Sequence, residues 1–206
     1  MLAPADITEI DEGLWRWTAR HPDWVPGAKP DSPADWPREV GSVAYATGDA
    51  LVVIDPLVPA EAEGLWAWLD ERAGAAGRVA VVTTIKWHRR SRDEVAERYG
   101  ASTSRSRAAL PDGVEPIPIR RAGETMFWLP GMKTLVPGDR LLGDGRGGLR
   151  LCPASWIGYL TTGFDLDALR ASLRPLLELP VERVLVSHGG PALRNGRGAI
   201  GAAIEA

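Results

Sequence analysis

Apolar and polar residues along the first half of the chain form short runs that predict four strands and two helices. The strands are expected at residues 14–18, 43–47, 51–55 and 78–84, where apolar residues alternate with polar ones or follow one another. The helices are expected at residues 59–73 and 91–99. Gly48 and Asp49 separate two of the strands as a hairpin turn does. Ser91 and Glu94 have the spacing of a capping box, and Gly100 supplies a helix stop.

The second half of the chain repeats this mixture of strands and helices. Further strands are expected at residues 115–120, 125–129, 133–136 and 182–187, and further helices at residues 165–179 and 192–206. Residues 21–37 are rich in proline, aspartate and tryptophan and are expected to form a long ordered loop. Because strands arrive in runs, with helices between some of them, we expect a mixed sheet protein with helices outside.

The composition is that of an ordinary globular protein. The 206 residues are 45% hydrophobic and 25% charged, and this length suits a single domain spanning residues 1–206. The formal net charge is −3, with both signs interspersed, which argues against a general nucleic-acid binder. We therefore expect a small molecule as the partner and no nucleic acid, and the oligomeric state stays open.

Features that the sequence lacks bear on its compartment. No run approaches the roughly 18 apolar residues of a membrane span, and the acidic N-terminus has no apolar signal-peptide segment. The single cysteine, Cys152, excludes a disulfide framework and is expected to be a buried, inert thiol. These features predict a cytoplasmic protein with no membrane partner. The preference for Arg over Lys is typical of a high-GC bacterial gene.

Two familiar motif classes carry no weight here. The G-x-G-x-x-G stretches at residues 143–148 and 196–201 lack the strand and the full helix that a dinucleotide fingerprint requires. No G-x-S-x-G is present in the chain, which disfavours a serine hydrolase. The chemistry is therefore expected elsewhere.

Polar residues of metal-ligand type follow three of the predicted strands. His88 lies shortly after a wholly apolar strand, and Asp139 and His188 each come directly after a later strand and its turn. Residues at strand ends can converge on one rim of a sheet, where sites are usually built. We expect these three side chains to meet in one cleft.

The order and spacing of these segments resemble the metallo-β-lactamase fold superfamily over nearly the whole chain. Residues 43–55 look like its opening strands and Asp-containing turn, and the segment TTIKWHRRSRDEV falls where the family carries H-x-H-x-D-H. Residues 124–139 look like the paired strands that end in the family's metal-bridging Gly-Asp, and VLVSHGG is similar to the segment of its last His. The resemblance implies an α+β fold, a four-layer αββα sandwich.

The chain departs from the family pattern at the motif itself. The four motif positions hold Lys86, His88, Arg90 and Ser91. Only His88 is a family ligand type, and residues 119–123, just before the strand where the family carries another His, contain none. The resemblance therefore implies a degenerate metal site made of His88, Asp139 and His188, with Asp139 and His188 as its catalytic pair.

A catalytic zinc needs three protein ligands and an open position for water. His88, Asp139 and His188 give that count, and the resemblance implies one zinc ion that lowers the pKa of its bound water to about 7. Asp55 and Glu124 are candidate extra carboxylates. The alternative is that both histidines are structural, with His88 on a surface loop and His188 bonded to the main chain.

Cations at the motif positions suggest another use of the cavity. Arg90 stands where the family has a metal-binding Asp, and a guanidinium can pair bidentately with a carboxylate. We hypothesise that Arg90 or Lys86 points into the former metal cavity and neutralises Asp139. The alternative is that Arg89, Arg90 and Arg92 form the solvated, basic start of a helix.

Tryptophan is unusually frequent, with nine residues. Trp15, Trp17 and Trp128 lie in strand-like contexts and are expected to fill the core. The wall of a substrate pocket is expected to include His21, Trp24, Trp36, Lys86, Trp87, Arg90 and Trp156.

Two functions remain open at this point, beside the weaker alternative of a purely structural partner protein. The first is a hydrolase with one metal ion that cleaves an ester, a thioester or a lactone-type small molecule. The second is a metal-free, non-catalytic descendant that acts as a small-molecule binding or interaction module. The retained Asp139 and His188 favour the first function, whereas Arg90 favours the second.

Overall fold

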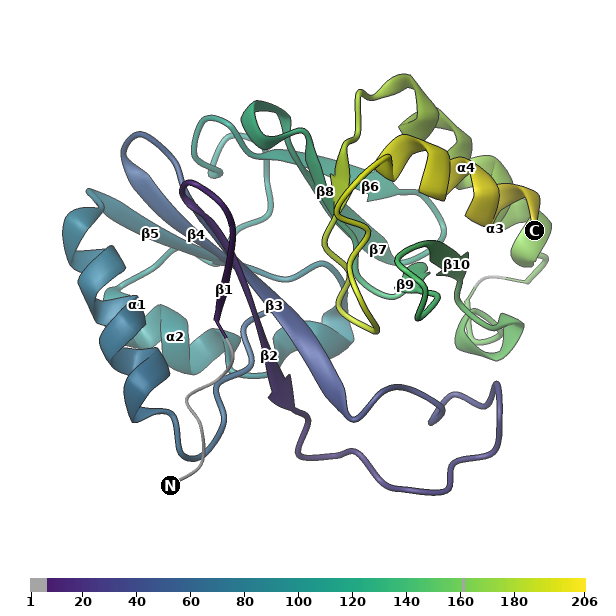
Figure 1. Cartoon of the computed structure of the whole chain (residues 1–206), viewed down its shortest axis with the longest axis horizontal. Helices are drawn as coiled ribbons and strands as arrows, with labels where there is room; N and C mark the ends of the chain where they lie inside the picture. Colours follow the sequence, from purple (N-terminus) through teal and green to yellow (C-terminus); the bar gives the residue numbers. More distant parts are fainter. Residues whose placement is uncertain (1–6, 161) are drawn as a thin grey trace.

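Two β-sheets lie face to face between two pairs of helices (Figure 1). The computed structural model describes residues 7–160 and 162–206. Residues 1–6, on which part of the signal-peptide argument depends, lie outside the described residues. The order of layers is helix pair, five-stranded sheet, four-stranded sheet, helix pair, so the expected α+β, four-layer αββα fold is confirmed.

The five-stranded sheet takes its strands from the N-terminal part of the chain in sequence order. These are β1 (Thr8–Asp11), β2 (Leu14–Arg20), β3 (Glu39–Ala46), β4 (Ala50–Ile54) and β5 (Arg78–Val82). Neighbours are antiparallel up to β4, and β5 runs parallel to β4 because a helix crosses over between them. All five residues of β4 are buried, as its unbroken apolar run predicts.

The second sheet has the order β11-β8-β7-β6. Its strands are β6 (Glu115–Ile119), β7 (Glu124–Leu129), β8 (Thr134–Val136) and β11 (Arg183–Val184). The pair β8 and β11 is parallel, and the other pairs are antiparallel. A separate two-stranded ribbon consists of β9 (Leu141–Gly143) and β10 (Leu149–Leu151).

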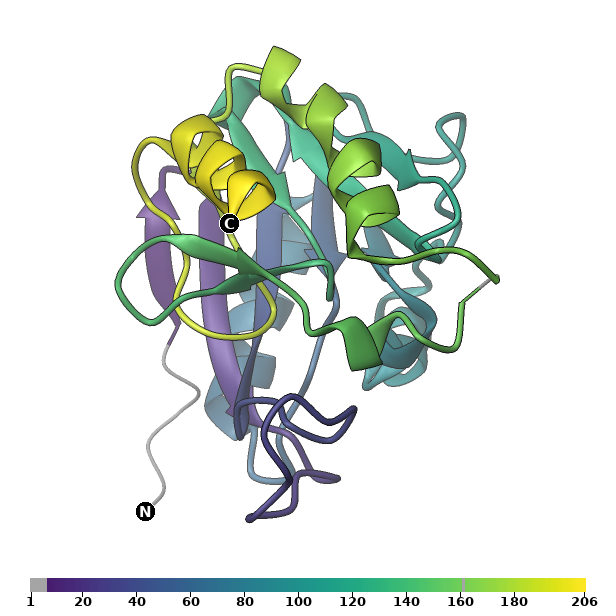
Figure 2. The same cartoon turned by 90° about the vertical axis from the view of Figure 1, so that its right-hand side faces the viewer.

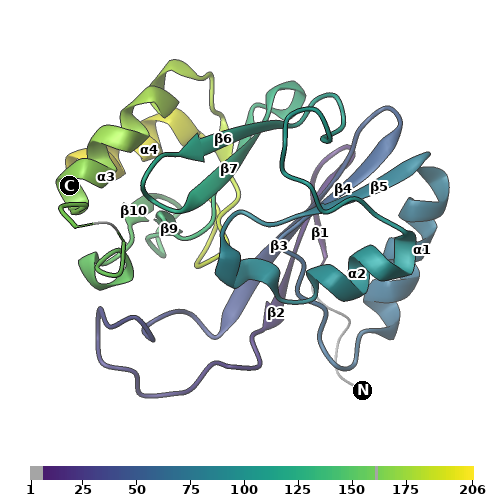
Figure 3. The same cartoon turned by 180° about the vertical axis from the view of Figure 1, so that it is seen from behind.

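Helices cover the outer faces of both sheets. The helices are α1 (Glu63–Ala75), α2 (Arg92–Tyr99), α3 (Leu166–Leu173) and α4 (Gly196–Glu205). Short 3-10 turns are formed by Lys86–Arg89, Pro130–Met132, Ala154–Trp156 and Arg174–Glu178. Figure 3 shows α1 and α2 beside β4 and β5, and Figure 2 shows α3 and α4 over the second sheet. Within the described ranges, no helix has the length and apolar character to cross a membrane.

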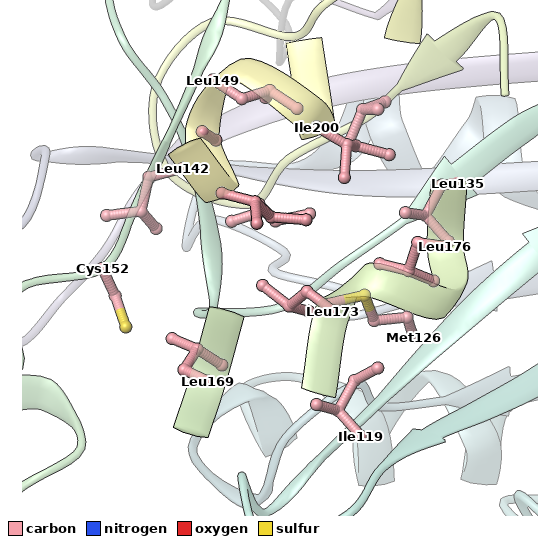
Figure 4. Close-up of a cluster of buried hydrophobic side chains, with 14 of the residues drawn as sticks. Ile119, Met126, Leu135, Leu142, Leu149, Cys152, Leu169, Leu173, Leu176 and Ile200 are labelled. Carbon is pink, nitrogen blue, oxygen red and sulfur yellow. The ribbon is translucent and has the colours of Figure 1, made fainter. Parts of the chain in front are cut away.

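Three apolar layers hold the sheets and helices together. Leu69 of α1 packs with the outer residues of the first sheet. Val52 and Phe127 belong to the layer between the two sheets. Leu135 and Leu173 belong to the layer between the second sheet and the C-terminal helices, which Figure 4 shows in close-up. Buried apolar residues therefore fix the strands of both sheets in place.

The capping box expected at the start of α2 is wrong. Ser91 is the N-cap residue, but its side chain makes no capping hydrogen bond. Instead, Ser91 Oγ accepts the N–H of Val58 at 3.0 Å, which ties the helix start to the loop after β4. The spacing of Ser91 and Glu94 therefore reflects a tertiary contact that a local pattern cannot show.

Several element boundaries differ from the expected ones. The helix α3 ends at Leu173 and continues as a 3-10 turn, because Pro175 has no N–H to donate to the helix. The last strand has only two residues, and α4 begins at Gly196 instead of residue 192. The strand β1 and the β9–β10 ribbon were not expected. Trp17 and Trp128 are buried and Trp15 is partly buried in the core, as expected.

Candidate metal centre

Three polar side chains meet where strands of the two sheets end. His88 lies on the 3-10 turn after β5, Asp139 follows β8, and His188 follows β11. All three are buried, and one ligand-type atom of each lies within 4.8 Å of the corresponding atoms of the other two. The structure thus brings together the three residues that the strand ends pointed to.

The Oδ1 atom of Asp139 lies between two imidazole rings. It is 2.9 Å from His88 Nε2 and 3.2 Å from His188 Nε2. Among the described residues, however, this buried oxygen has no partner in hydrogen-bonding geometry. A buried carboxylate oxygen without a donor is costly. Two nitrogens and one oxygen crowded in this way suit a divalent transition ion such as zinc, so the side chains present fit a metal.

Asp55 determines which nitrogen of His88 is free. Its Oδ1 accepts the N–H of Thr84 at 2.7 Å, and its Oδ2 lies 2.5 Å from Thr84 Oγ1 and 2.8 Å from His88 Nδ1. With Nδ1–H directed at Asp55, the lone pair of His88 Nε2 is left for a ligand. His188 lacks such support, because its buried Nδ1 has no hydrogen-bond partner in the described part of the chain.

Glu124 holds the loop that carries Asp139. Its buried carboxylate accepts three consecutive main-chain N–H groups, those of Gly138 at 3.0 Å, Asp139 at 2.8 Å and Arg140 at 3.0 Å. A Cβ on Gly138 would lie 2.5 Å from Thr84 Oγ1, so this close approach requires glycine. Glu124 is therefore committed to the main chain and is not available as a metal ligand.

The electrostatics of the three side chains are strongly coupled. Burial and the Arg90 charge oppose protonation of His88, but Asp139 and Asp55 outweigh them and raise its pKa to about 9. Burial would raise the pKa of Asp139, but the charge of His88 and the closeness of both imidazoles hold that pKa well below its usual range. Burial lowers the pKa of His188 despite the neighbouring Asp139. Without a metal, His88 is thus the charged imidazole.

The hypothesis that Arg90 or Lys86 neutralises Asp139 is wrong. Arg90 points inward, but its guanidinium donates to the carbonyls of Gly41 and Asp55 at 3.1 and 3.2 Å and to Ser187 Oγ at 2.7 Å. Lys86 is exposed, and its Nζ lies 4.0 Å from the ring centre of a neighbouring tryptophan. Because these main-chain carbonyls and the Ser187 hydroxyl accept its hydrogen bonds, the Arg90 guanidinium forms no ion pair with Asp139.

The alternative for these cations holds only in part. Arg89 and Arg92 form exposed ion pairs with Asp93, as a solvated helix start would. Arg90, between them, has a φ of 34° that turns its side chain away from this surface. A charge run in the sequence therefore divides into two solvated cations and one internal cation.

A cavity of about 580 Å³ opens onto the three side chains. Besides His88, Asp139 and His188, its wall contains His21, Asp23, Pro33, Trp36, Trp87, Ser155, Trp156 and Tyr159. The ring centres of Trp36 and Trp156 lie 6.0 and 5.5 Å from that of His188, both edge-on. The space next to the candidate ligands is therefore bounded mainly by aromatic faces and edges.

The aromatic walls are held by hydrogen bonds from two loops. Trp24 Nε1 donates to the carbonyl of Trp36 within the loop between β2 and β3, and Trp156 Nε1 donates to the carbonyl of Ser32, both at 3.0 Å. Buried Arg140 donates to the carbonyl of Trp156 at 3.2 Å and to Tyr159 Oη at 3.0 Å. The segment beside Asp139 thus also positions the far wall.

The expected pocket residues fall into two groups. The structure places His21, Trp36, Trp87 and Trp156 in the wall, whereas Trp24 lies outside it and fixes Trp36. Lys86 stays on the rim, and Arg90 faces a neighbouring cavity. Pro33, Ser155 and Tyr159 were not anticipated. All three lie in loops without periodicity, and only their proximity to aromatic residues in the sequence could have signalled them.

Comparison with known proteins places the fold. No protein-family model matches the chain, and no curated protein matches it either. Solved metallo-β-lactamases are similar in structure. One from Erythrobacter litoralis has a TM-score of 0.65 at 16% identity, over 100% of this chain and 92% of the other. The enzyme DIM-1 has a TM-score of 0.61 at 16% identity over 100% and 98%, and one from Hirschia baltica has 0.57 at 13% over 98% and 97%. The chain therefore has the metallo-β-lactamase fold.

Proposed function

We propose that the protein binds one divalent transition metal ion, with zinc as the first candidate, through His88, Asp139 and His188. The observation that carries this proposal is the buried Oδ1 of Asp139, which lies within 3.2 Å of two imidazole nitrogens without hydrogen-bonding geometry. A metal ion satisfies all three atoms at once. The cavity that opens onto the three side chains would give water or a substrate access to that ion, as a catalytic site requires.

The activity that follows from this site is hydrolysis of an ester, thioester or lactone-type small molecule. The metal, when bound, supplies Lewis acidity and a water of lowered pKa. Asp55 keeps the His88 ring in the tautomer that presents Nε2. Trp36 and Trp156 would hold an apolar part of the substrate and exclude bulk water from its carbonyl group. The likeness to metallo-β-lactamases supports the proposal only at the level of the fold.

A metal-free binding module is the second candidate, and one observation favours it. Both nitrogens of His88 lie near carboxylates, Nδ1 at 2.8 Å from Asp55 and Nε2 at 2.9 Å from Asp139. A protonated His88 between two carboxylates partly balances the buried charge without any metal. In that case the aromatic cavity binds a small molecule and cleaves nothing.

Zinc titration of chelator-treated protein, followed by calorimetry and elemental analysis, separates the two functions. We expect one zinc per wild-type chain and a loss of affinity of more than about 100-fold in His188→Ala, because losing a ligand costs more than losing its support. The matched control is His21→Ala, which removes an imidazole of the cavity wall that is not one of the three proposed ligands.

Two outcomes would contradict the metal site. Wild-type protein that takes up no zinc, manganese or iron leaves the metal-free binding module as the function. Equal affinities in wild type and His188→Ala would place the metal elsewhere. If zinc binds as expected, hydrolysis of simple aryl esters, thioesters and lactones by the zinc-loaded protein then tests the reaction class.

A further inference from the structure

A second cavity of about 360 Å³ adjoins the aromatic one. His21, Asp23 and Trp87 contribute to the walls of both cavities. The second cavity differs in its charged residues, because Arg20 and Arg90 also line it. Pro22, the four residues 57–60 after β4, and Ser91 complete the wall. These three residues therefore form a partition between the two cavities, of which the first is lined mainly by aromatic residues and the second also by two cations.

Arg20 is a cation without a partner in the part of the chain that the structure describes. It is exposed at the end of β2, and none of the ion pairs or side-chain hydrogen bonds there involves it. Glu39 lies opposite Arg20 in the β2–β3 register, but the two charges form no ion pair. The Arg20 guanidinium is therefore available to bind an anion that enters the second cavity.

Arg90 adds a fixed, half-buried positive charge to the same wall. Its three hydrogen bonds go to two carbonyls and one hydroxyl, which are neutral acceptors. Its Nε has no partner among the described residues. Asp55 and Asp139 lie near enough to interact with its charge, but neither forms an ion pair with it. The cationic end of the cavity thus keeps positive charge that main-chain contacts do not neutralise.

The other polar groups of the second cavity leave this excess in place. His21 Nδ1 accepts the N–H of Asp23 at 3.2 Å, so a neutral His21 carries its proton on Nε2 and is a donor. Asp23 is the one carboxylate that lines this cavity within the described residues. Two guanidinium groups therefore face one carboxylate.

We propose that the second cavity is an anion subsite, which takes a carboxylate or phosphate group of the substrate while an apolar group lies between Trp36 and Trp156. Its use as a substrate subsite rests on the proposed hydrolase function, whereas anion binding itself does not need the metal. The substrate is then a carbonyl compound that carries an anionic group on one side of the scissile bond and an apolar group on the other. Asp23, at the partition, limits the affinity for that anion.

The test measures binding to metal-depleted protein by calorimetry, with three probes of similar shape. These are 3-phenylpropionate, phenyl phosphate and the uncharged 3-phenylpropanol. We expect at least one anion to bind more tightly than the alcohol, and added salt to weaken only the anions. Preference between the two anions identifies the group that the subsite takes.

Variants locate the effect. Arg20→Ala is expected to weaken binding of the preferred anion about five-fold, as loss of an exposed charge pair does, and to leave the alcohol unchanged. Asp23→Asn is expected to strengthen anion binding, because it removes the opposing carboxylate. The matched control is Arg38→Ala, which removes an exposed arginine that lines neither cavity.

Equal affinities for the anions and the alcohol, or equal effects of Arg20→Ala and Arg38→Ala, would overturn the subsite. Neither result depends on whether zinc binds, because the protein is metal-free in every arm. Failure of the zinc titration would remove the hydrolase and leave the anion subsite standing, so the two failures are distinguishable.

Discussion

At the scale of single residues, the buried polar groups near the centre hold its parts in place. Asp55 orients His88, Glu124 holds the main chain beside Asp139, and Arg90 ties the carbonyl of Gly41 to Ser187. Asp55 also accepts hydrogen bonds from Thr84, and Arg90 also lines the second cavity, so each substitution here calls for a measurement of both zinc affinity and fold stability.

Replacing Asp55 tests the orientation of His88. Asp55→Asn is expected to weaken zinc binding by about 10-fold or more, because groups that orient a metal-bound imidazole have effects of that size. Asparagine tolerates the positive φ of 51° at this position, so the backbone should stay in place. The measurement is zinc affinity by competition with a chromogenic chelator.

The matched control for that variant is Asp144→Asn, which removes an exposed carboxylate in the turn between β9 and β10. Zinc affinity that is equal in Asp55→Asn and in the control would mean that Asp55 does not orient the ligand.

Residues with a regular structural context could be found from the sequence. His88, Asp139 and His188 each follow a strand that its apolar run reveals, and strand ends gather at an edge. The task of Asp55 depends on a contact with His88, 33 positions away, which no local pattern encodes. The inward turn of Arg90 likewise depends on carbonyls of Gly41 and Asp55, which are distant in sequence.

At the scale of elements, β3 lies very close to the segment after β11 at Gly41. Its N–H donates to the carbonyl of Ser187 at 2.7 Å, next to His188. A Cβ at Gly41 would lie 2.6 Å from Arg16 Nη2 and 2.8 Å from the carbonyl oxygen of Val186. This strand therefore touches the segment that carries the last imidazole.

Gly41→Ala is expected to lower the free energy of unfolding by about 2 kcal/mol, as overpacking against a main-chain atom does. It should also weaken zinc binding, because His188 must move with its neighbours. Denaturant unfolding and zinc titration measure the two effects.

The control is Gly48→Ala in the β3–β4 turn, where an added Cβ meets nothing within 4 Å. A similar loss of stability in both variants would show that the cost comes from glycine flexibility and not from the contact at Gly41.

Elements with long apolar runs were predictable, and short ones were not. Runs of consecutive apolar residues predict the strands β4 and β5. The β9–β10 ribbon has three residues on each side, too few to show a period. The early end of α3 did have a signal, Pro175, which the apolar stripe on either side of it obscured.

At the scale of the whole molecule, the layer between the sheets joins the two halves of the chain. Val52 from the first sheet and Phe127 from the second belong to the same buried cluster. Phe127 is fully buried. Removing its ring therefore leaves a cavity between the two sheets. The chain is therefore expected to unfold as one cooperative unit.

Phe127→Ala tests this expectation. It should lower the free energy of unfolding by about 3–5 kcal/mol, with tryptophan fluorescence and circular dichroism shifting together. The control is Val25→Ala, at a residue that is 59% exposed. Two separate transitions in the variant would mean that the sheets unfold independently and that residues 1–206 hold more than one domain.

His88 follows a strand of the first sheet, whereas Asp139 and His188 follow strands of the second, and this bears on when the site can form during translation. The strands β1 to β5 are consecutive along residues 8–82, so the first sheet can assemble while the rest of the chain is still inside the ribosome. Of the three ligand-type residues, only His88 is near that segment. If an ion is bound as proposed, the nascent chain cannot hold it through all three groups until the stretch after β11 has emerged, so metal capture would have to wait for the second sheet.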